Sequence, residues 1–220
     1  MKKLHINLGM TAALFLSGSA YAVPTDFDFS GTFSADNDIV LLDFTVGSDS
    51  TITIFSSSWG DDLGNGDGWV SGSGFDPVLA IWDDSGNLVA EQDDGEVEGT
   101  TASNGVDYTH GFWDSFFDVF LTAGSYTASI TQYDNFSFSS SLSYGFYYDG
   151  NPNYTFDEGF GTAALFNGVW DSPDPRTGDW QFHILNVESA SQQGTVPEPS
   201  TLALMALGLA GLGYRKNKQA

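Results

Sequence analysis

Short runs in which apolar and polar residues alternate fill the middle of this chain and constrain its fold most strongly. Residues 27–33 read FDFSGTF, residues 51–55 read TITIF and residues 126–130 read YTASI, and a period of two is that of a strand with one buried face. Fuller apolar runs between Gly, Asp and Ser turns cover residues 39–46, 78–82, 116–121 and 180–187. Because no long helical period occurs outside the two ends, the sequence predicts one all-β domain, an antiparallel β-sandwich of jelly-roll-like form.

The N-terminal end has the pattern of a signal peptide. Lys2 and Lys3 precede an apolar stretch over residues 6–16, and Ala20 and Ala22 supply the small-x-small site that signal peptidase needs. We therefore expect a signal helix within residues 1–22, cleavage before Val23, and export. The chain contains no cysteine, so an exported fold of this sequence is stabilised by its core, or by its core plus a metal, rather than by disulfides.

The C-terminal end has the composition of a processing tail. Residues 196–200 read VPEPS, residues 201–214 are apolar, and a basic end with Arg215, Lys216 and Lys218 follows. A 14-residue helix would be about 21 Å long, short of a bilayer core of roughly 30 Å, which suits a transmembrane segment that is held briefly. The run has no polar face, so an amphipathic helix packed on the domain fits badly.

This order of features resembles the PEP-CTERM sorting tail of exported proteins in exopolysaccharide-producing Gram-negative bacteria. The resemblance implies that Pro197, Glu198 and Pro199 form the recognition motif, and that Arg215 and Lys216 mark the cytoplasmic side. It also implies an exosortase-type enzyme and the inner membrane as transient partners, and a final place at the cell surface or in the extracellular matrix. The expected organisation is a signal peptide (1–22), a sandwich domain (23–188), a polar spacer (189–195) and a sorting tail (196–220).

Charge excludes several classes of partner. Between Val23 and Pro197 the only cation is Arg176, against every acidic residue of the chain except Glu198. Nucleic acid and anionic lipid are repelled by such a surface. Cations, neutral glycans such as exopolysaccharide, and solvent remain as partners.

The aspartates suggest calcium as a possible cofactor, because calcium takes six to eight hard oxygen ligands from several loops. A turn at Asp83 to Asn87 predicts a hairpin, and this hairpin could bring Asp76, Asp84 and Asp93 to one end of the sandwich. The spacing matches no EF-hand loop, and turn aspartates bonded to their own backbone are the alternative. The full set of candidate ligands is Asp76, Asp83, Asp84, Asp93, Asp94 and Asp107.

Aromatic residues in glycine-rich, loop-like settings suggest a glycan-contact patch, since sugar rings stack on exposed aromatic faces. The candidates are Trp59, Trp69, Tyr147 and Tyr148, and burial in the core is the alternative for each.

Catalysis is not expected from the sequence. After signal cleavage, His110 and His183 are the only histidines, and His183 lies between apolar strand residues, where a hydrogen-bonded core or edge histidine is the commoner role. The chain has no G-x-S-x-G elbow, no cysteine nucleophile and no H-E-x-x-H motif. The Asp93–Asp94 pair could in principle act as a glycosidase pair, but a chain so rich in Asp offers pairs by chance.

A second resemblance covers nearly all of residues 27–190. Residues 74–95 (GFDPVLAIWDDSGNLVAEQDDG) and 121–135 (LTAGSYTASITQYDN) are similar to PEP-CTERM proteins whose sandwich looks like the bacterial pre-peptidase C-terminal domain. The resemblance implies an accessory domain of the surface-binding kind without catalytic activity. We therefore expect an exported, non-catalytic surface or matrix protein associated with exopolysaccharide in a biofilm, with a structural or adhesive envelope protein as the alternative and a hydrolase as the less favoured one.

Overall fold

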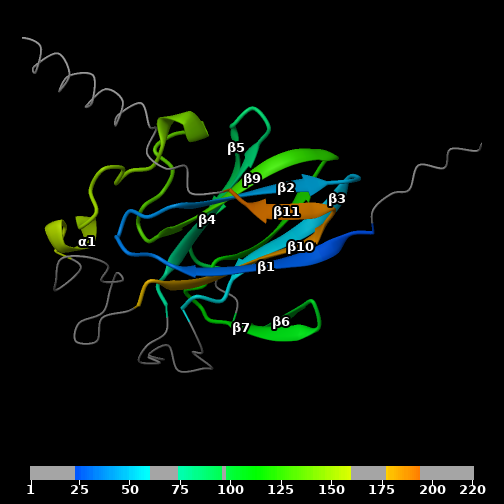
Figure 1. Cartoon of the computed structure of the whole chain (residues 1–220), viewed down its shortest axis with the longest axis horizontal. Helices are drawn as coiled ribbons and strands as arrows, with labels where there is room; N and C mark the ends of the chain where they lie inside the picture. The colour runs from blue at the N-terminus through cyan, green and yellow to red at the C-terminus, as the bar shows by residue number, and fades with distance from the viewer. Residues whose placement is uncertain (1–22, 60–73, 96–97, 160–176, 194–220) are drawn as a thin grey trace, which may run out of the picture.

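Two antiparallel sheets packed face to face form the body of the protein in a computed structural model (Figure 1), which describes residues 23–59, 74–95, 98–159 and 177–193. The four-stranded sheet has the order β1 (Thr25–Thr32), β10 (Asp179–Val187), β3 (Ser50–Ser56) and β8 (Phe116–Leu121). The five-stranded sheet has the order β11 (Ser189–Gln192), β2 (Val40–Val46), β9 (Gly124–Gln132), β4 (Pro77–Asp83) and β5 (Leu88–Gln92). The predicted all-β sandwich is thus confirmed.

Smaller elements flank the two sheets. A separate hairpin consists of β6 (Gly99–Ser103) and β7 (Val106–His110), while η1 (Leu142–Tyr144) and α1 (Tyr154–Asp157) are short helical turns in the segment after β9. No helix in the described part of the chain is long and apolar enough to cross a membrane. The predicted signal helix and transmembrane helix, and the glycine-aspartate loop that contains Trp69, lie outside the described residues.

The core lies between the sheets and follows the predicted alternation. In β10, Trp180, Phe182 and Ile184 point inward, and the residues between them point out. Burying side chains of this size stabilises the fold by about 1.5–3 kcal/mol each. The principal core residues are Leu42, Phe44, Ile52, Ile54, Leu79, Ile81, Ala128, Ile130, Phe182 and Ile184.

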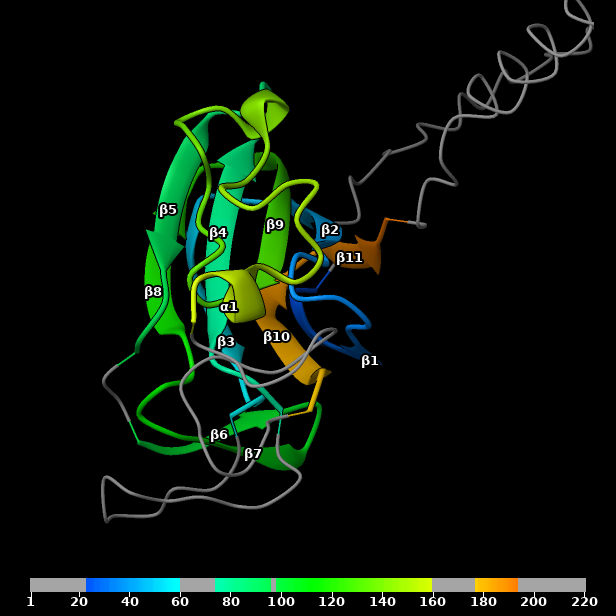
Figure 2. The same ribbon diagram turned by 90° about the vertical axis from the view of Figure 1, so that its left-hand side faces the viewer.

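Strand β4 is buried on both faces, which explains its continuous apolar run. Leu79 and Ile81 face the core, whereas Ala80 and Trp82 face outward and pack under the segment after β9 against Phe146. The outer face of the five-stranded sheet is therefore partly covered by residues 133–159. Figure 2 shows this segment in front of β4 and β9.

The predicted polar spacer begins later than expected. Residues 189–192 form β11, which pairs with β2 from Ser189 with Thr45 to Gln192 with Leu42, and the Gln193 N–H donates to the Leu41 carbonyl at 2.9 Å. Backbone groups make these bonds, so a polar edge strand needs no apolar pattern. Ala190 packs against the core and fixes which face of β11 points inward. The sandwich therefore extends past residue 188.

Candidate functional site

A groove of about 770 Å³ runs over the outer face of the five-stranded sheet. Its floor comes from outward-facing residues of β11, β2 and β9, and its walls come from the β4–β5 turn and from η1. Hydroxyl and carboxylate side chains dominate the lining. The lining residues are Asp43, Phe44, Thr45, Asp83, Asp84, Ser85, Gly86, Ser125, Tyr126, Thr127, Ser141, Leu142, Ser143, Ser189 and Ser191.

The strand register explains why these polar side chains gather. Asp43 of β2 stands between Ser191 of β11 and Thr127 of β9, all on the outer face. The Asp43 carboxylate accepts hydrogen bonds from the Thr127 hydroxyl at 3.1 Å and from the Gln193 amide at 2.7 Å. No lysine or arginine occurs in the described ranges, so the groove presents carboxylates and hydroxyls without a cation.

The turn at one wall of the groove is held by Asp83. Its carboxylate accepts from the Ser85 N–H at 2.9 Å, the Asn87 N–H at 2.8 Å and the Asn87 amide at 2.9 Å. Hydrogen bonds from Asn87, followed by that from Ser85, lower the pKa of Asp83 below its usual value. This confirms the predicted hairpin and gives Asp83 the role of a turn residue.

The candidate calcium ligands do not converge as expected. Asp76 precedes β4 and Asp93 follows β5, so they lie at one end of the hairpin, whereas Asp84 lies in the turn at the other end. The seven residues of β4 separate these ends by roughly 20 Å. The expected grouping of Asp76, Asp84 and Asp93 is therefore wrong, because antiparallel pairing places a strand's start beside its partner's end. Asp107 lies apart from both ends, in β7.

Acidic residues do gather around Tyr133. Burial, and then the charges of Asp134, Asp93, Asp76 and Asp94, raise the pKa of Tyr133. No three His, Asp or Glu side chains in the described part of the chain are arranged to hold a metal ion. Calcium binding stays a prediction.

The four aromatic candidates have different surroundings. Trp59 is buried beside Trp113, with ring centroids 6.2 Å apart, and Tyr148 stacks on Tyr154 at 3.9 Å, so neither ring is open on both faces. Tyr147 is 60% exposed and meets Phe138 edge to face. Trp69 lies in a part of the chain that the structure does not describe.

Tyr144 is an exposed aromatic that the sequence analysis did not select. It is 69% exposed and belongs to η1, whose other two residues, Leu142 and Ser143, line the groove. The position of η1 beside the groove depends on the turn after Ser141, where the Leu142 N–H donates to the Gly86 carbonyl at 2.9 Å. That long-range contact gives no local sequence signal.

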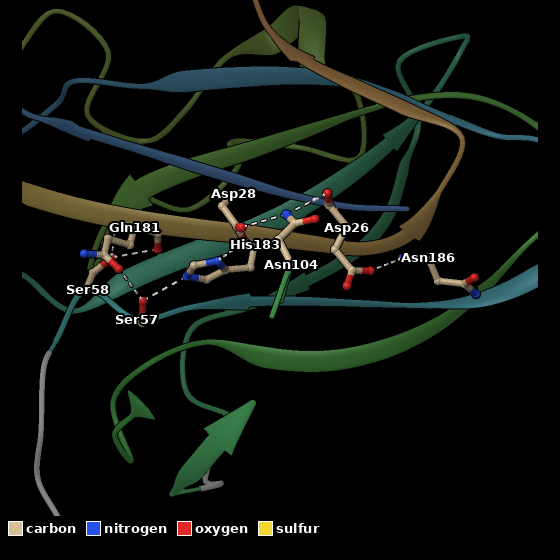
Figure 3. A network of polar contacts seen from close by, with 8 residues as sticks. All are labelled: Asp26, Asp28, Ser57, Ser58, Asn104, Gln181, His183 and Asn186. Atoms are coloured by element: carbon tan, nitrogen blue, oxygen red, sulfur yellow. Dashed lines mark hydrogen bonds and ion pairs between the residues drawn. The ribbon is translucent and has the colours of Figure 1, made fainter. Parts of the chain in front are cut away.

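A second polar cluster lies on the outer face of the four-stranded sheet (Figure 3). His183 Nδ1 is 2.7 Å from Asp28 Oδ1, and His183 Nε2 is 2.9 Å from Ser57 Oγ. Ser57 Oγ also lies 3.0 Å from the amide oxygen of Gln181, Oε1. The side chains come from β1, from the residue that follows β3 and from β10, and Asp28 and His183 are directly paired in the register.

The β6–β7 hairpin covers this cluster. The Tyr108 ring lies 4.0 Å from the His183 ring, and Phe55 stacks on the other side at 4.4 Å. The Asn104 amide at the hairpin turn donates to Asp28 Oδ2 at 2.8 Å. As a result His183 is 1% exposed although it lies outside the inter-sheet core.

The charge states in the cluster follow from burial and hydrogen bonding. Burial lowers the pKa of His183, although the hydrogen bond that His183 donates to Asp28 opposes this shift. Burial tends to raise the pKa of Asp28, but hydrogen bonds, chiefly from His183, lower it overall. At neutral pH the cluster therefore holds a neutral imidazole next to a carboxylate.

The neighbouring backbone is anchored by Asp114, which is fully buried. Its carboxylate accepts from the N–H groups of Ser58 at 2.7 Å and Trp59 at 3.1 Å. The sequence expectation that His183 is a hydrogen-bonded histidine agrees with the geometry, but its partners could not be chosen without the strand register. One of them, Ser57, stands in a run of three serines that carries no motif.

Comparison with known families identifies the C-terminal end. Residues 195–218 match the PEP-CTERM protein-sorting motif. The motif indicates a protein that is exported, processed at the membrane by an exosortase-type enzyme and then displayed at the surface. No curated protein matches the chain. The expected resemblance of the sandwich to pre-peptidase C-terminal domains stays a prediction.

Proposed function

We propose that this exported protein is a surface or matrix protein that binds a glycan without anionic groups in the groove over the five-stranded sheet. The observation that carries the proposal is the lining of that groove. Side-chain hydroxyls of Thr45, Ser125, Thr127, Ser189 and Ser191 stand beside the Asp43 carboxylate on one flat floor. Sugars present many hydroxyls that both donate and accept, so such a floor complements them.

The size and edge of the groove support the same ligand class. A volume of about 770 Å³ lies within the usual range for small-molecule sites. Tyr144, which follows the lining residue Ser143 in η1, offers an exposed aromatic face on which a sugar ring can stack. Ser125, Ser189 and Ser191 make no side-chain hydrogen bond to any other described residue, so their hydroxyls can bond to a ligand.

The negative charge of the groove determines which class of glycan it can bind. The carboxylates of Asp43, Asp83 and Asp84 repel uronate, sulfate or phosphate groups, and the described residues include no cation to offset them. A neutral or amine-bearing polysaccharide suits this surface. Together with the sorting motif, this favours a place in the exopolysaccharide of a biofilm.

A polysaccharide pull-down tests the proposal. The purified full chain is passed over a neutral glucan, over chitosan as the amine-bearing matrix and over alginate as the anionic one. We expect retention on the first or second and none on alginate. Replacing Tyr144→Ala should weaken retention about tenfold, because a stacked aromatic contributes up to about 1.5 kcal/mol.

Phe120→Ala is the matched control, since Phe120 is 66% exposed on β8 of the other sheet. Equal retention of both variants and the native chain would place binding elsewhere. Retention that needs calcium would support the acidic end around Tyr133 instead of the groove. No retention on any matrix would favour the structural or adhesive alternative.

A further inference from the structure

The hydrogen bonds around His183 fix how its two nitrogens are used. Asp28 is a carboxylate and can only accept, so His183 Nδ1 carries the proton of the 2.7 Å contact. In the neutral imidazole Nε2 is then an acceptor, and the Ser57 hydroxyl donates to it at 2.9 Å. This is the order of nucleophile, base and orienting acid that activates a serine.

Gln181 completes the arrangement. In the structure Gln181 Oε1 lies 3.0 Å from Ser57 Oγ. Ser57 has one hydroxyl proton, and when that proton is directed at His183 the amide has to turn so that its nitrogen donates to the serine oxygen. The two ends of an amide are equal in shape and exchange by a half-turn. With its amide turned in this way, Gln181 would offer an N–H donor next to the serine oxygen, where negative charge would develop on a substrate carbonyl.

Access is restricted to one side. His183 is buried under Tyr108, whereas Ser57 is partly exposed and Gln181 is exposed. A substrate therefore approaches from the side of the serine oxygen and the amide, and the leaving alcohol and water would meet the imidazole only at Nε2, beside Ser57 Oγ. The N–H groups of Ser57, Ser58 and Trp59 are already bonded, to the Gln181 carbonyl and to Asp114. The Gln181 side chain is the available donor at this position.

We propose that Ser57, His183 and Asp28 hydrolyse a small carboxylic ester, with Gln181 stabilising the oxyanion. Ser57 Oγ attacks the ester carbonyl while His183 Nε2 takes its proton, and the tetrahedral oxyanion accepts from Gln181. The C–O bond to the alcohol then breaks, and His183 returns the proton to the alcohol. A water molecule, deprotonated by His183 Nε2, next attacks the acyl-serine. The C–O bond to the serine then breaks, His183 returns the proton to Ser57 Oγ, and the carboxylic acid is released. Asp28 touches no reacting atom and is a positioning residue.

The acyl group has to be short because Ser57 lies between the Gln181 side chain and the covered imidazole. Desolvation, which holds His183 neutral, suits a general base at neutral pH. This activity does not depend on glycan binding in the groove, which lies on the other sheet. The expectation from the sequence that the chain is not an enzyme is decided by the same experiment.

The test uses a fluorophosphonate probe and 4-nitrophenyl acetate on the purified full chain. We expect the probe to add to the peptide that contains Ser57, and acetate release to fall at least about 100-fold in Ser57→Ala. Ser58→Ala is the matched control, because Ser58 is adjacent and hydrogen-bonded to Gln181 but does not touch His183. Its labelling should stay unchanged.

A pH profile separates positioning from folding. Labelling should rise as His183 loses its proton, and Asp28→Asn should move that rise to lower pH, because an anion that favours the imidazolium is gone. Loss of fold alone would lower the amplitude without moving the midpoint. No probe addition to the native chain, or equal acetate release by native protein and Ser57→Ala, would overturn the proposal.

Discussion

Asp114 is expected to be among the most sensitive positions of the fold. It joins the end of β3 to the turn before β8, and four donors converge on its carboxylate. Oδ1 accepts from the Ser56 hydroxyl at 2.7 Å and from the N–H groups of Ser58 and Trp59, and Oδ2 accepts from the Gly111 N–H at 2.9 Å. Asp114→Ala would leave three buried N–H groups without their acceptor.

The magnitude follows from that count. Each buried donor left unsatisfied costs about 1–3 kcal/mol, so the loss for three is about 3 kcal/mol at least. Domains of this kind are stable by about 5–15 kcal/mol, so Asp114→Ala removes a large share. Asp114→Asn keeps an oxygen for the bonds at Oδ1, but its amide nitrogen would face the Gly111 N–H, and both are donors. Only one N–H group then lacks an acceptor, so the loss of stability should be smaller than in Asp114→Ala.

The pH dependence gives a second test. Burial raises the pKa of Asp114 despite its hydrogen bonds. A group whose pKa is raised on folding contributes most below its unfolded pKa, and this contribution falls as the pH rises through the folded pKa. The advantage of the native chain over Asp114→Asn should therefore shrink as the pH rises from about 4.

Urea unfolding of the purified protein, followed by tryptophan fluorescence, measures both effects. Asp118→Ala is a matched control, because Asp118 accepts one exposed hydroxyl, that of Thr53 at 2.6 Å, and should change stability by less than about 0.5 kcal/mol. Equal loss in the two alanine variants would refute the count of buried donors. If the stability difference between the native chain and Asp114→Asn grew with pH, the hydrogen bonds would have a larger effect on the pKa of Asp114 than burial has.

Three further predictions concern other parts of the chain. Because the pKa of Asp83 is lowered, its hydrogen bonds in the β4–β5 turn stabilise the fold above the unfolded pKa, and this stabilisation is lost as the pH falls through the folded pKa. In Asp83→Ala the free energy of unfolding should therefore depend less on pH in this range. A pH dependence equal to that of the native chain would contradict the prediction. Gly178→Ala would place a Cβ 2.1 Å from the Phe33 carbonyl oxygen, so thermal unfolding should show a loss of roughly 1–3 kcal/mol, and native-like stability would be inconsistent with this packing. Replacing Pro197 and Pro199 by alanine should leave the tail uncut on immunoblots of membrane fractions, and normal processing would argue against this motif as the recognition element.

The strands that carry an apolar pattern could be predicted from the sequence. The alternation in residues 51–55 and 126–130 corresponds to β3 and β9, and the fuller run at 78–82 corresponds to β4, which has two buried faces. The strands that were not predicted, β6, β7 and β11, are short and polar. Their pairing depends on backbone bonds and on neighbours distant in sequence, so no periodicity marks them.

The polar clusters could not be predicted because they depend on register. Asp28 and His183 are 155 positions apart and meet only because β1 pairs with β10 in one alignment. A shift of one residue would turn either side chain to the other face of its sheet. The same reason separates Asp76 from Asp84, since the direction of β4 decides the end at which each lies.

Strand β11 occupies most of the predicted spacer and so shortens the tether between the folded body and the sorting motif. A free spacer of seven residues would reach roughly 24 Å, but Gln193 still bonds to β2, and the sorting motif begins two residues later. Two residues reach only about 7 Å. During processing the start of the sorting motif is therefore held close to the sandwich, and the exosortase-type enzyme has to work beside a folded, strongly acidic body or separate β11 from β2 to gain room. Access of the enzyme to the motif in the folded protein thus depends on the stability of one four-residue strand, β11.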